Sequence, residues 1–405
     1  MSPLKRILLG ILLLAAVIGI GYAIYFFFFA PSAPATTPTN ANANNPSGNL
    51  PAAGAAGNRP VVPENGNANA GLPSASPVAR GGLTIVSTLV SGQTIGATLG
   101  TDGQSVNYYD PVTGKFFTVL PDGTKRELSS QIFPDVQNVT WSADAKTAVI
   151  EFPDGSKITF NFDTQKQTTL PKTWSDFSFS QGGDLTTKNL SDNSAENWLV
   201  VSKTDGSDPQ AVEPMGDNSD KVIVKQSPNG QVAAFSLTGP ITDVGSRTIL
   251  LIGKNGENLP GITVKGENFD PLWSPNGALL LYSTAATDDD YKPRLYIVDG
   301  TGQTPGGDKI TTNLFTMADK CVFADEKTIY CAVPDALPEG SGLDPEILNN
   351  TPDSIYSINA ATGAVTFVGR PENDMTVSKL QISKDGANLY LLDATTGFIK
   401  KMLLR

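Results

Sequence analysis

Short apolar segments separated by turns run along the chain from residue 83 onward. The stretch LWSPNGALLLYST, residues 272–284, shows the unit: the end of one strand, an Asn-Gly turn and a second strand that is apolar throughout. An Asn-Gly pair between two such segments is typical of a two-residue β-hairpin, because both turn residues need a positive φ. Helical periodicity is absent outside an N-terminal apolar run, so the pattern predicts an all-β domain over residues 83–405.

The unit recurs, and its period indicates the architecture. Aligned on the last residue of the strand before the turn, seven copies are anchored at Leu99, Trp141, Phe179, Gln226, Trp273, Phe323 and Ile382. The anchors are about 40 to 60 residues apart, near the period of four-stranded propeller blades. We expect a seven-bladed β-propeller of four-stranded antiparallel blades; six or eight blades, and tandem β-sandwiches, are the alternatives.

The best copy of the unit also carries a family resemblance. WSPNGALLLYS followed by RLYIVDGTG resembles the repeat of TolB-like propellers, also called WD-repeat-like, over roughly residues 83–405. TolB proper has a small α/β domain before its propeller, and here other material occupies that place. The resemblance therefore implies the fold more strongly than the role.

Residues 83–90, LTIVSTLV, precede the first complete blade. Propeller rings avoid an open strand edge by completing the last blade with a strand from the other end of the chain. The last blade supplies only three strands of its own, so residues 83–90 are predicted to be its fourth strand.

The first 82 residues divide into two segments of different composition. Residues 1–30 are predicted to form a cytoplasmic tip and a transmembrane helix, because residues 7–29 contain no charge and are long enough to cross a bilayer. Lys5 and Arg6 precede this run, which predicts a cytoplasmic N-terminus and an extracytoplasmic propeller. A cleaved signal peptide is the alternative. Residues 31–82 are rich in Pro, Ala, Asn and Gly, and are expected to be a disordered linker.

Charge and composition restrict the chemistry. The chain has 29 Lys+Arg against 40 Asp+Glu, a net charge of -11, so binding to nucleic acid is not expected. Histidine is absent, which excludes His-based acid/base catalysis, Ser-His-Asp machinery and His-ligated zinc. Carboxylate chemistry, calcium bound by oxygen ligands, and binding without chemistry remain. No cofactor is expected, with calcium left open.

The loops between the second and third strands of three consecutive blades are long, and long loops on a rigid scaffold commonly bind ligands. They read TGPITDVGS, AATDDDYKP and PDALPEGSGLDPEILNNTPDS. Apolar residues among acidic neighbours in the third loop suit a protein contact, or an Ω-loop that folds onto itself. The three consecutive aspartates of the second loop lack the spacing of a calcium loop, so a solvated acidic loop is the alternative to a site. The predicted binding residues are Asp288, Asp289, Asp290, Tyr291, Leu337, Glu339, Asp344, Glu346, Ile347 and Leu348.

Two further patterns emerge from the repeat. An aspartate precedes six of the seven anchors: Asp135, Asp176, Asp220, Asp270, Asp319 and Asp374. These carboxylates could ring the mouth of a central channel and attract a cation or a basic peptide, or could cap backbone N–H groups between blades. Cys321 and Cys331 flank one hairpin and would face each other, as a disulfide or as two buried thiols.

These features together predict a membrane-anchored extracytoplasmic propeller. We expect a non-catalytic protein-binding scaffold in the cell envelope, whose partner is an envelope or cell-surface protein. The alternative is a carbohydrate-binding or carbohydrate-active envelope protein that uses carboxylates on the long-loop face.

Overall fold

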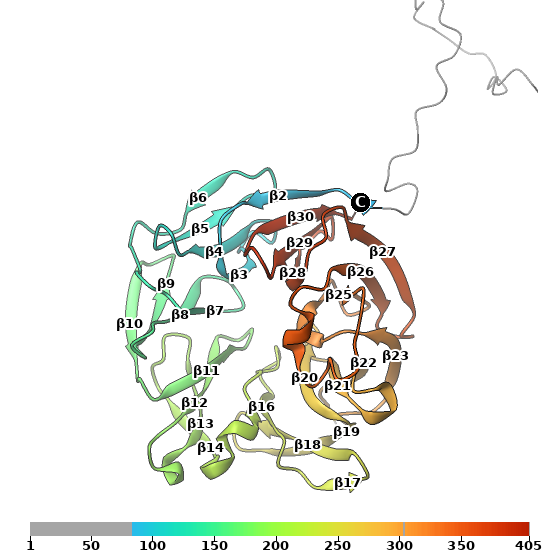
Figure 1. The fold of residues 1–405 in the computed structure, drawn as a ribbon. Helices are drawn as coiled ribbons and strands as arrows, with labels where there is room; N and C mark the ends of the chain where they lie inside the picture. Colours follow the sequence, from blue (N-terminus) through green and yellow to red (C-terminus); the bar gives the residue numbers. More distant parts are fainter. Residues whose placement is uncertain (1–82, 303, 405) are drawn as a thin grey trace, which may run out of the picture. The chain divides into compact units, whose positions relative to one another are not determined.

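The computed structural model describes residues 83–302 and 304–404, and shows seven β-sheets arranged around a central axis (Figure 1). The predicted seven-bladed propeller is confirmed, and the tandem-sandwich and the six- and eight-bladed alternatives are wrong. The innermost three strands and the outermost strand of each blade are, in order of blade: β3 (Ile95–Leu99), β4 (Val106–Asp110), β5 (Lys115–Val119), β6 (Lys125–Glu127); β7 (Asn138–Trp141), β8 (Thr147–Glu151), β9 (Lys157–Asn161), β10 (Lys166–Leu170); β11 (Trp174–Phe179), β12 (Asp184–Asn189), β13 (Trp198–Lys203), β14 (Gln210–Pro214); β15 (Val222–Ile223), β16 (Val232–Ser236), β18 (Ser246–Gly253), β19 (Asn258–Lys265); β20 (Glu267–Trp273), β21 (Leu279–Ala285), β22 (Pro293–Asp299), β23 (Ile310–Phe315); β24 (Cys321–Phe323), β25 (Thr328–Pro334), β26 (Asp353–Asn359), β27 (Val365–Pro371); β28 (Val377–Ile382), β29 (Asn388–Asp393), β30 (Ile399–Leu403), β2 (Val86–Val90).

The anchors of the repeat lie at the end of the innermost strand of each blade, followed by the turn to the second strand. Trp273 ends β20, and a tight turn with Gly277 at φ 77° leads into β21. The fourth blade departs from the pattern, because β15 ends at Ile223, before its anchor Gln226. Its second-to-third connection contains a further short strand, β17 (Ile241–Asp243), paired with β18.

The strand expected to complete the last blade divides into two parts. Val86–Val90 (β2) pairs antiparallel with β30 and forms the outer strand of the seventh blade. Leu83–Thr84 (β1) instead pairs parallel with β27 of the sixth blade. The N-terminal segment therefore joins two neighbouring blades, and it leaves no unpaired outer edge on β30.

The core consists of apolar layers between neighbouring blades. Alternate residues of one strand face opposite blades: Leu280 and Tyr282 of β21 pack toward the fourth blade, while Leu281 packs toward the sixth. Both faces of the middle strands are therefore buried, which explains why the segment after each turn is apolar throughout.

Within the described part of the chain, the only helical segments are short 3-10 turns. They are η2 (Ser194–Glu196), η3 (Gly216–Lys221), η4 (Thr287–Asp289), η5 (Ala318–Lys320) and η6 (Pro345–Leu348). No helix among these residues is long and apolar enough to cross a bilayer. The predicted transmembrane helix at residues 7–29 and the predicted linker at residues 31–82 lie outside the described residues.

Candidate functional site

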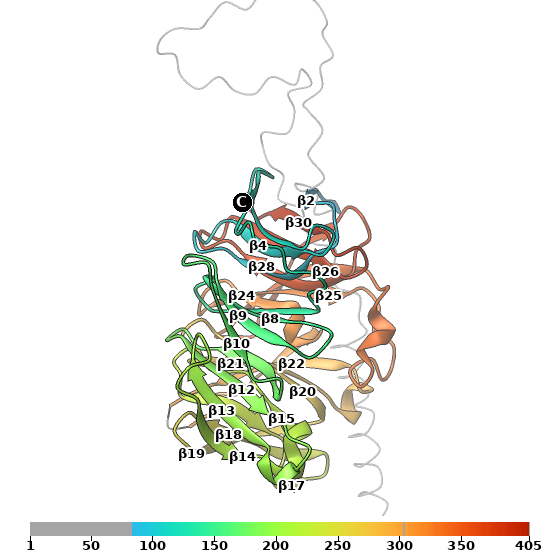
Figure 2. The ribbon, with the colours of Figure 1, turned by 90° about the vertical axis from the view of Figure 1, so that its left-hand side faces the viewer.

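The loops between the second and third strands project from one face of the ring, and two of them form one unit. The segment between β25 and β26, orange in the side view, extends beyond its blade (Figure 2). The backbone N–H of Gly340 donates to the carbonyl of Asp290 at 2.9 Å, and that of Gly342 donates to the carbonyl of Tyr291 at 2.8 Å. Asn268 Nδ2 donates to the carbonyl of Gly342 at 2.8 Å. We call residues 286–292 together with residues 335–352 the loop platform.

The three consecutive aspartates of the platform each pair with a cation. Lys265 pairs with Asp288, Arg294 pairs with Asp289 at 2.6 Å, and Lys292 pairs with Asp290 at 3.1 Å. These pairs neutralise the acidic run within its own blade. Among residues 83–302 and 304–404, no group of three or more Cys, Asp or Glu side chains is placed to hold a metal ion.

The longer loop of the platform exposes apolar side chains among acidic ones. Ile347 is 45% exposed, and Leu343 is 44% exposed. Leu348 is buried and Leu337 is half-buried. The predicted acidic neighbours, Glu339, Asp344 and Glu346, are all exposed. The loop therefore folds partly onto itself, as the Ω-loop alternative supposed, and still presents two apolar side chains.

Leu343 is not among the residues predicted from the sequence, although it lies in the same loop. The signal that could have identified it is its place between Gly342 and Asp344, in an acidic segment with few apolar residues. Its exposure depends on the contact of Gly342 with the neighbouring blade, which the sequence does not show.

The six aspartates before the anchors do not form one cluster. Asp270 and Asp319 lie together, because Asp270 Oδ2 accepts a hydrogen bond from the backbone N–H of Asp319 at 2.8 Å. Loss of water around Asp319, together with the negative charge of Asp270, raises the pKa of Asp319 to about 6. This is the only strong pKa shift among the predicted site residues that the structure describes.

The other four aspartates have separate environments. Asp176 pairs with Lys188 at 2.6 Å, and Asp374 pairs with Arg370 of β27 at 3.0 Å. Asp135 and Asp220 are exposed in the connections that lead from one blade to the next. The alternative interpretation, as polar residues at blade crossings, fits these four better than a ring of ligands.

Two lysines in the central channel were not anticipated. Lys225 and Lys379 line one channel cavity of about 440 Å³, which also contains Asp319. The opposite side of the channel has a cavity of about 610 Å³, lined by Asp176 and Glu151 among others. The channel therefore carries charge of both signs.

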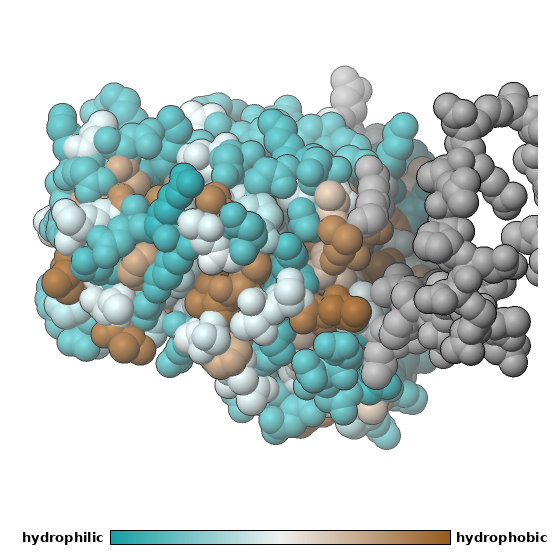
Figure 3. Space-filling view, turned by 90° about the horizontal axis from the view of Figure 1, so that it is seen from above, coloured by the Kyte–Doolittle hydropathy of each residue, from teal (hydrophilic) through white to brown (hydrophobic). Residues whose placement is uncertain are grey.

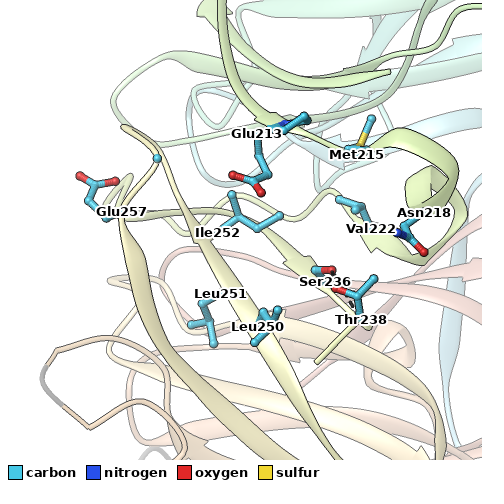
Figure 4. A pocket seen from close by; sticks show the side chains of 12 residues that line it. Glu213, Met215, Asn218, Val222, Ser236, Thr238, Leu250, Leu251, Ile252 and Glu257 are labelled. Carbon is cyan, nitrogen blue, oxygen red and sulfur yellow. Dashed lines mark hydrogen bonds between the residues drawn. The ribbon is translucent and has the colours of Figure 1, made fainter. Parts of the chain in front are cut away.

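A third hollow lies between the third and fourth blades. It has a volume of about 260 Å³, and Figure 4 shows its side chains. The carboxylates of Glu213 and Glu257 lie at its rim, and Ile252 supplies apolar surface. The hydroxyl groups of Ser236 and Thr238 lie 2.8 Å apart within it. Glu257 accepts hydrogen bonds from Asn255, which lower its pKa, so this carboxylate is already engaged by its own turn.

Cys321 and Cys331 lie directly opposite each other on β24 and β25, with Cα atoms 4.0 Å apart, and form a disulfide. The bond joins the innermost strand of the sixth blade to its second strand, within the core layer shared with the fifth blade. Its position indicates a structural role.

The outer edge of the ring offers less for binding than the platform or the channel. Figure 3 shows one part of this edge as mostly hydrophilic, with apolar side chains in small separate groups. Such scattered apolar residues are normal on soluble surfaces.

Comparison with known proteins supports the fold without giving a family. No family model matches the sequence, and no curated protein matches it. An oligogalacturonate lyase solved in complex with manganese is similar in structure, with a TM-score of 0.53 and 12% identity, over 80% of this chain and 91% of the lyase. An oligogalacturonate lyase from Vibrio parahaemolyticus gives a TM-score of 0.53 and 10% identity over the same shares of the two chains. The β-propeller domain of Cps50 (Swd1) from Myceliophteria thermophila gives a TM-score of 0.53 and 10% identity, over 79% of this chain and 99% of that domain.

These similarities correct one expectation. The chain was expected to be non-catalytic, but structures of the same fold include lyases, so the propeller does not argue against an enzyme. At identities of 10 to 12%, the likeness extends to the fold alone. The fold in general supports a scaffold or binding role.

Proposed function

We propose that this protein is a TolB-like propeller that is held at the outer side of a membrane and binds another protein of the envelope or cell surface through the loop platform. The observation that carries the proposal is the joining of two loops from neighbouring blades by backbone hydrogen bonds. Loops fixed in this way lose little conformational entropy on binding, because they are already ordered.

The side chains of the platform indicate the chemistry of the partner. Leu343 and Ile347 are the exposed apolar contacts, and Glu339, Asp344 and Glu346 surround them with negative charge. An apolar centre with a charged rim is the usual composition of a protein interface. We therefore expect a partner that presents an apolar patch with a basic rim, which would also speed encounter with an acidic protein.

The test is in-cell crosslinking of the full-length protein, followed by mass spectrometry. The variant is the double substitution Leu343→Ser and Ile347→Ser, which removes the exposed apolar surface and leaves the backbone contacts of the platform. The control is Val112→Ser, because Val112 is 86% exposed on the corresponding loop of the first blade. One crosslinked protein that is lost in the double variant and kept in the control supports the proposal. Equal capture by all three forms refutes it.

The membrane location is a separate part of the proposal and rests on the apolar run at residues 7–29. Cell fractionation and protease treatment of intact cells or spheroplasts would test it. The propeller should be found in the membrane fraction and be digested from outside. A protein that is fully released in soluble form would favour the cleaved signal peptide instead.

A carbohydrate-active enzyme is the second candidate, and the Asp270–Asp319 pair favours it. A carboxyl group with a pKa of about 6 beside an ionisable neighbour is suited to general acid/base catalysis. Two of the proteins similar in structure are oligogalacturonate lyases. Cleavage assays with oligogalacturonate and with neutral oligosaccharides would test this candidate. Activity that is lost in Asp319→Asn and kept in Asp374→Asn would support it, and no cleavage of any of these substrates would count against it.

A further inference from the structure

The cavity that contains Lys225 and Lys379 has an unusual distribution of charge. Neither lysine takes part in any of the ion pairs formed by the described residues. Lys379 Nζ has only a long hydrogen bond of 3.3 Å, to the backbone carbonyl of Ala97. In a chain whose net charge is -11, two lysines that share a cavity without a carboxylate partner are exceptional.

The two lysines are close enough to repel each other. Enclosure by the channel walls lowers the pKa of Lys379, and the positive charge of Lys225 lowers it further. An anionic group placed between the two ammonium groups would relieve this repulsion and replace the water that they lost. The lysine pair therefore suits a carboxylate.

Asp319 limits the net charge of the ligand. It lines the same cavity, next to Asp270, and Lys225 is near enough to favour its ionised form. The cavity thus has two lysines in one part and two acidic groups at the platform end. Lys320, which follows Asp319, is already paired with the buried Asp353 at 2.7 Å and faces away from this role. A dianion would be repelled by the acidic end, whereas a ligand with one negative and one positive group would be attracted to both ends.

The remaining walls are apolar. Leu272, Val322 and Leu380 line the cavity between the charged groups, and they come from three innermost strands. A volume of about 440 Å³ is sufficient for a molecule of the size of an amino acid together with water.

We propose that this channel cavity binds a small zwitterion of the amino-acid class, with its carboxylate between Lys225 and Lys379 and its ammonium group toward Asp319. The apolar walls contact the rest of the ligand. This site is independent of the loop platform, since Lys225 and Lys379 belong to neither of the two loops.

The test is isothermal titration calorimetry of the full-length protein in mild detergent with each of the twenty standard amino acids. For the amino acid that binds best, the matched probes are its analogue without the ammonium group and its analogue without the carboxylate; for leucine these are 4-methylpentanoate and 3-methylbutylamine. We expect each analogue to bind at least about ten-fold more weakly than the zwitterion, because each loses one charge-assisted contact.

The variants Lys225→Gln and Lys379→Gln should each weaken binding by at least about ten-fold. Both substitutions remove repulsion between like charges, so both proteins are expected to fold, and a thermal unfolding scan would verify this. The control is Lys166→Gln, because Lys166 is exposed on the outermost strand of the second blade.

Three outcomes would overturn the inference. They are no binding of any amino acid at millimolar concentration, equal binding of the carboxylate-only analogue, and binding unchanged in both channel variants. Loss of the platform's partner in the crosslinking experiment would not affect this result, so the two proposals fail separately.

Discussion

The indole Nε1 of Trp273 donates a hydrogen bond to the backbone carbonyl of Lys225 at 3.0 Å, and so joins the end of one innermost strand to the chain that follows the innermost strand of the preceding blade. Trp141 Nε1 makes the corresponding bond to the carbonyl of Gly96 at 2.6 Å. The tryptophan at the start of the WSPNG-type turn is thus a connection between blades as well as a core residue.

We expect Trp273→Phe to lower the free energy of unfolding by about 1 to 3 kcal/mol, because it removes a hydrogen bond to a half-buried carbonyl and keeps most of the ring stacked on Phe235. Chemical denaturation measures this loss. Trp141→Phe should behave in the same way, with Phe162 as the stacking neighbour. Unfolding curves that coincide with wild type for both variants would show that these bonds do not stabilise the ring.

The buried ion pair between Lys320 and Asp353 should be sensitive to loss of one partner. Lys320→Met leaves the buried Asp353 carboxylate with the backbone N–H of Val377 as its remaining polar contact, so we expect a loss of about 3 to 5 kcal/mol. The control is Lys172→Met, which breaks an exposed pair with Asp154 and should change stability by about 0.5 kcal/mol or less. Similar effects of the two substitutions would mean that burial of the pair has no energetic consequence.

Asp319 predicts a pH-dependent difference in stability. Its pKa is raised from the ordinary aspartate value of 3.8 to about 6 in the folded protein, so folding favours the protonated form. The stabilising contribution of that form is fully present below about pH 4 and is lost as the pH rises through about 6. Relative to wild type, Asp319→Asn should therefore become more stable between about pH 4 and pH 7, as measured by denaturation at several pH values. A difference that does not vary over this range would contradict the raised pKa.

The disulfide closes a loop with a sequence separation of 10, for which the chain-entropy model gives a stabilisation of about 3 kcal/mol. Replacing both Cys321 and Cys331 with alanine should lower the free energy of unfolding by about this amount, together with a small loss of packing. Reducing agent should destabilise the wild type to a similar extent and leave the double variant unchanged. If the reductant has no effect on the wild type, the bond is absent in the protein under those conditions.

Closure of the ring by the N-terminal strand can be tested with two neighbouring residues of β2. Val86 is buried against the seventh blade, and Ser87 is exposed. Val86→Asp places an unpaired charge in the core and should destabilise the propeller by about 3 kcal/mol or more. Ser87→Asp should change stability by about 0.5 kcal/mol or less. Equal effects in thermal unfolding would show that β2 does not pack as the outer strand.

Features that depend on neighbouring residues along the chain could be predicted from the amino-acid sequence alone. Seven turns with their flanking strands could be recognised because a hairpin needs only local alternation and turn residues with positive φ. The pairing of Cys321 with Cys331 followed from the same local geometry, since both flank one hairpin. The binding role of the predicted loop residues stays a prediction.

Which residues of different blades meet depends on the folded ring. Asp270 and Asp319 lie together, whereas Asp135 and Asp374 do not join them, because the connections between blades differ in length and direction. The residue immediately before an anchor lines the channel in several blades, as Thr140, Lys225, Leu272, Val322 and Gln381 do. Alternation along the innermost strands could have indicated Lys225, but its closeness to Lys379 depends on closure of the ring. The platform likewise depends on Gly342 reaching Tyr291 across two blades, a long-range contact that no local pattern encodes.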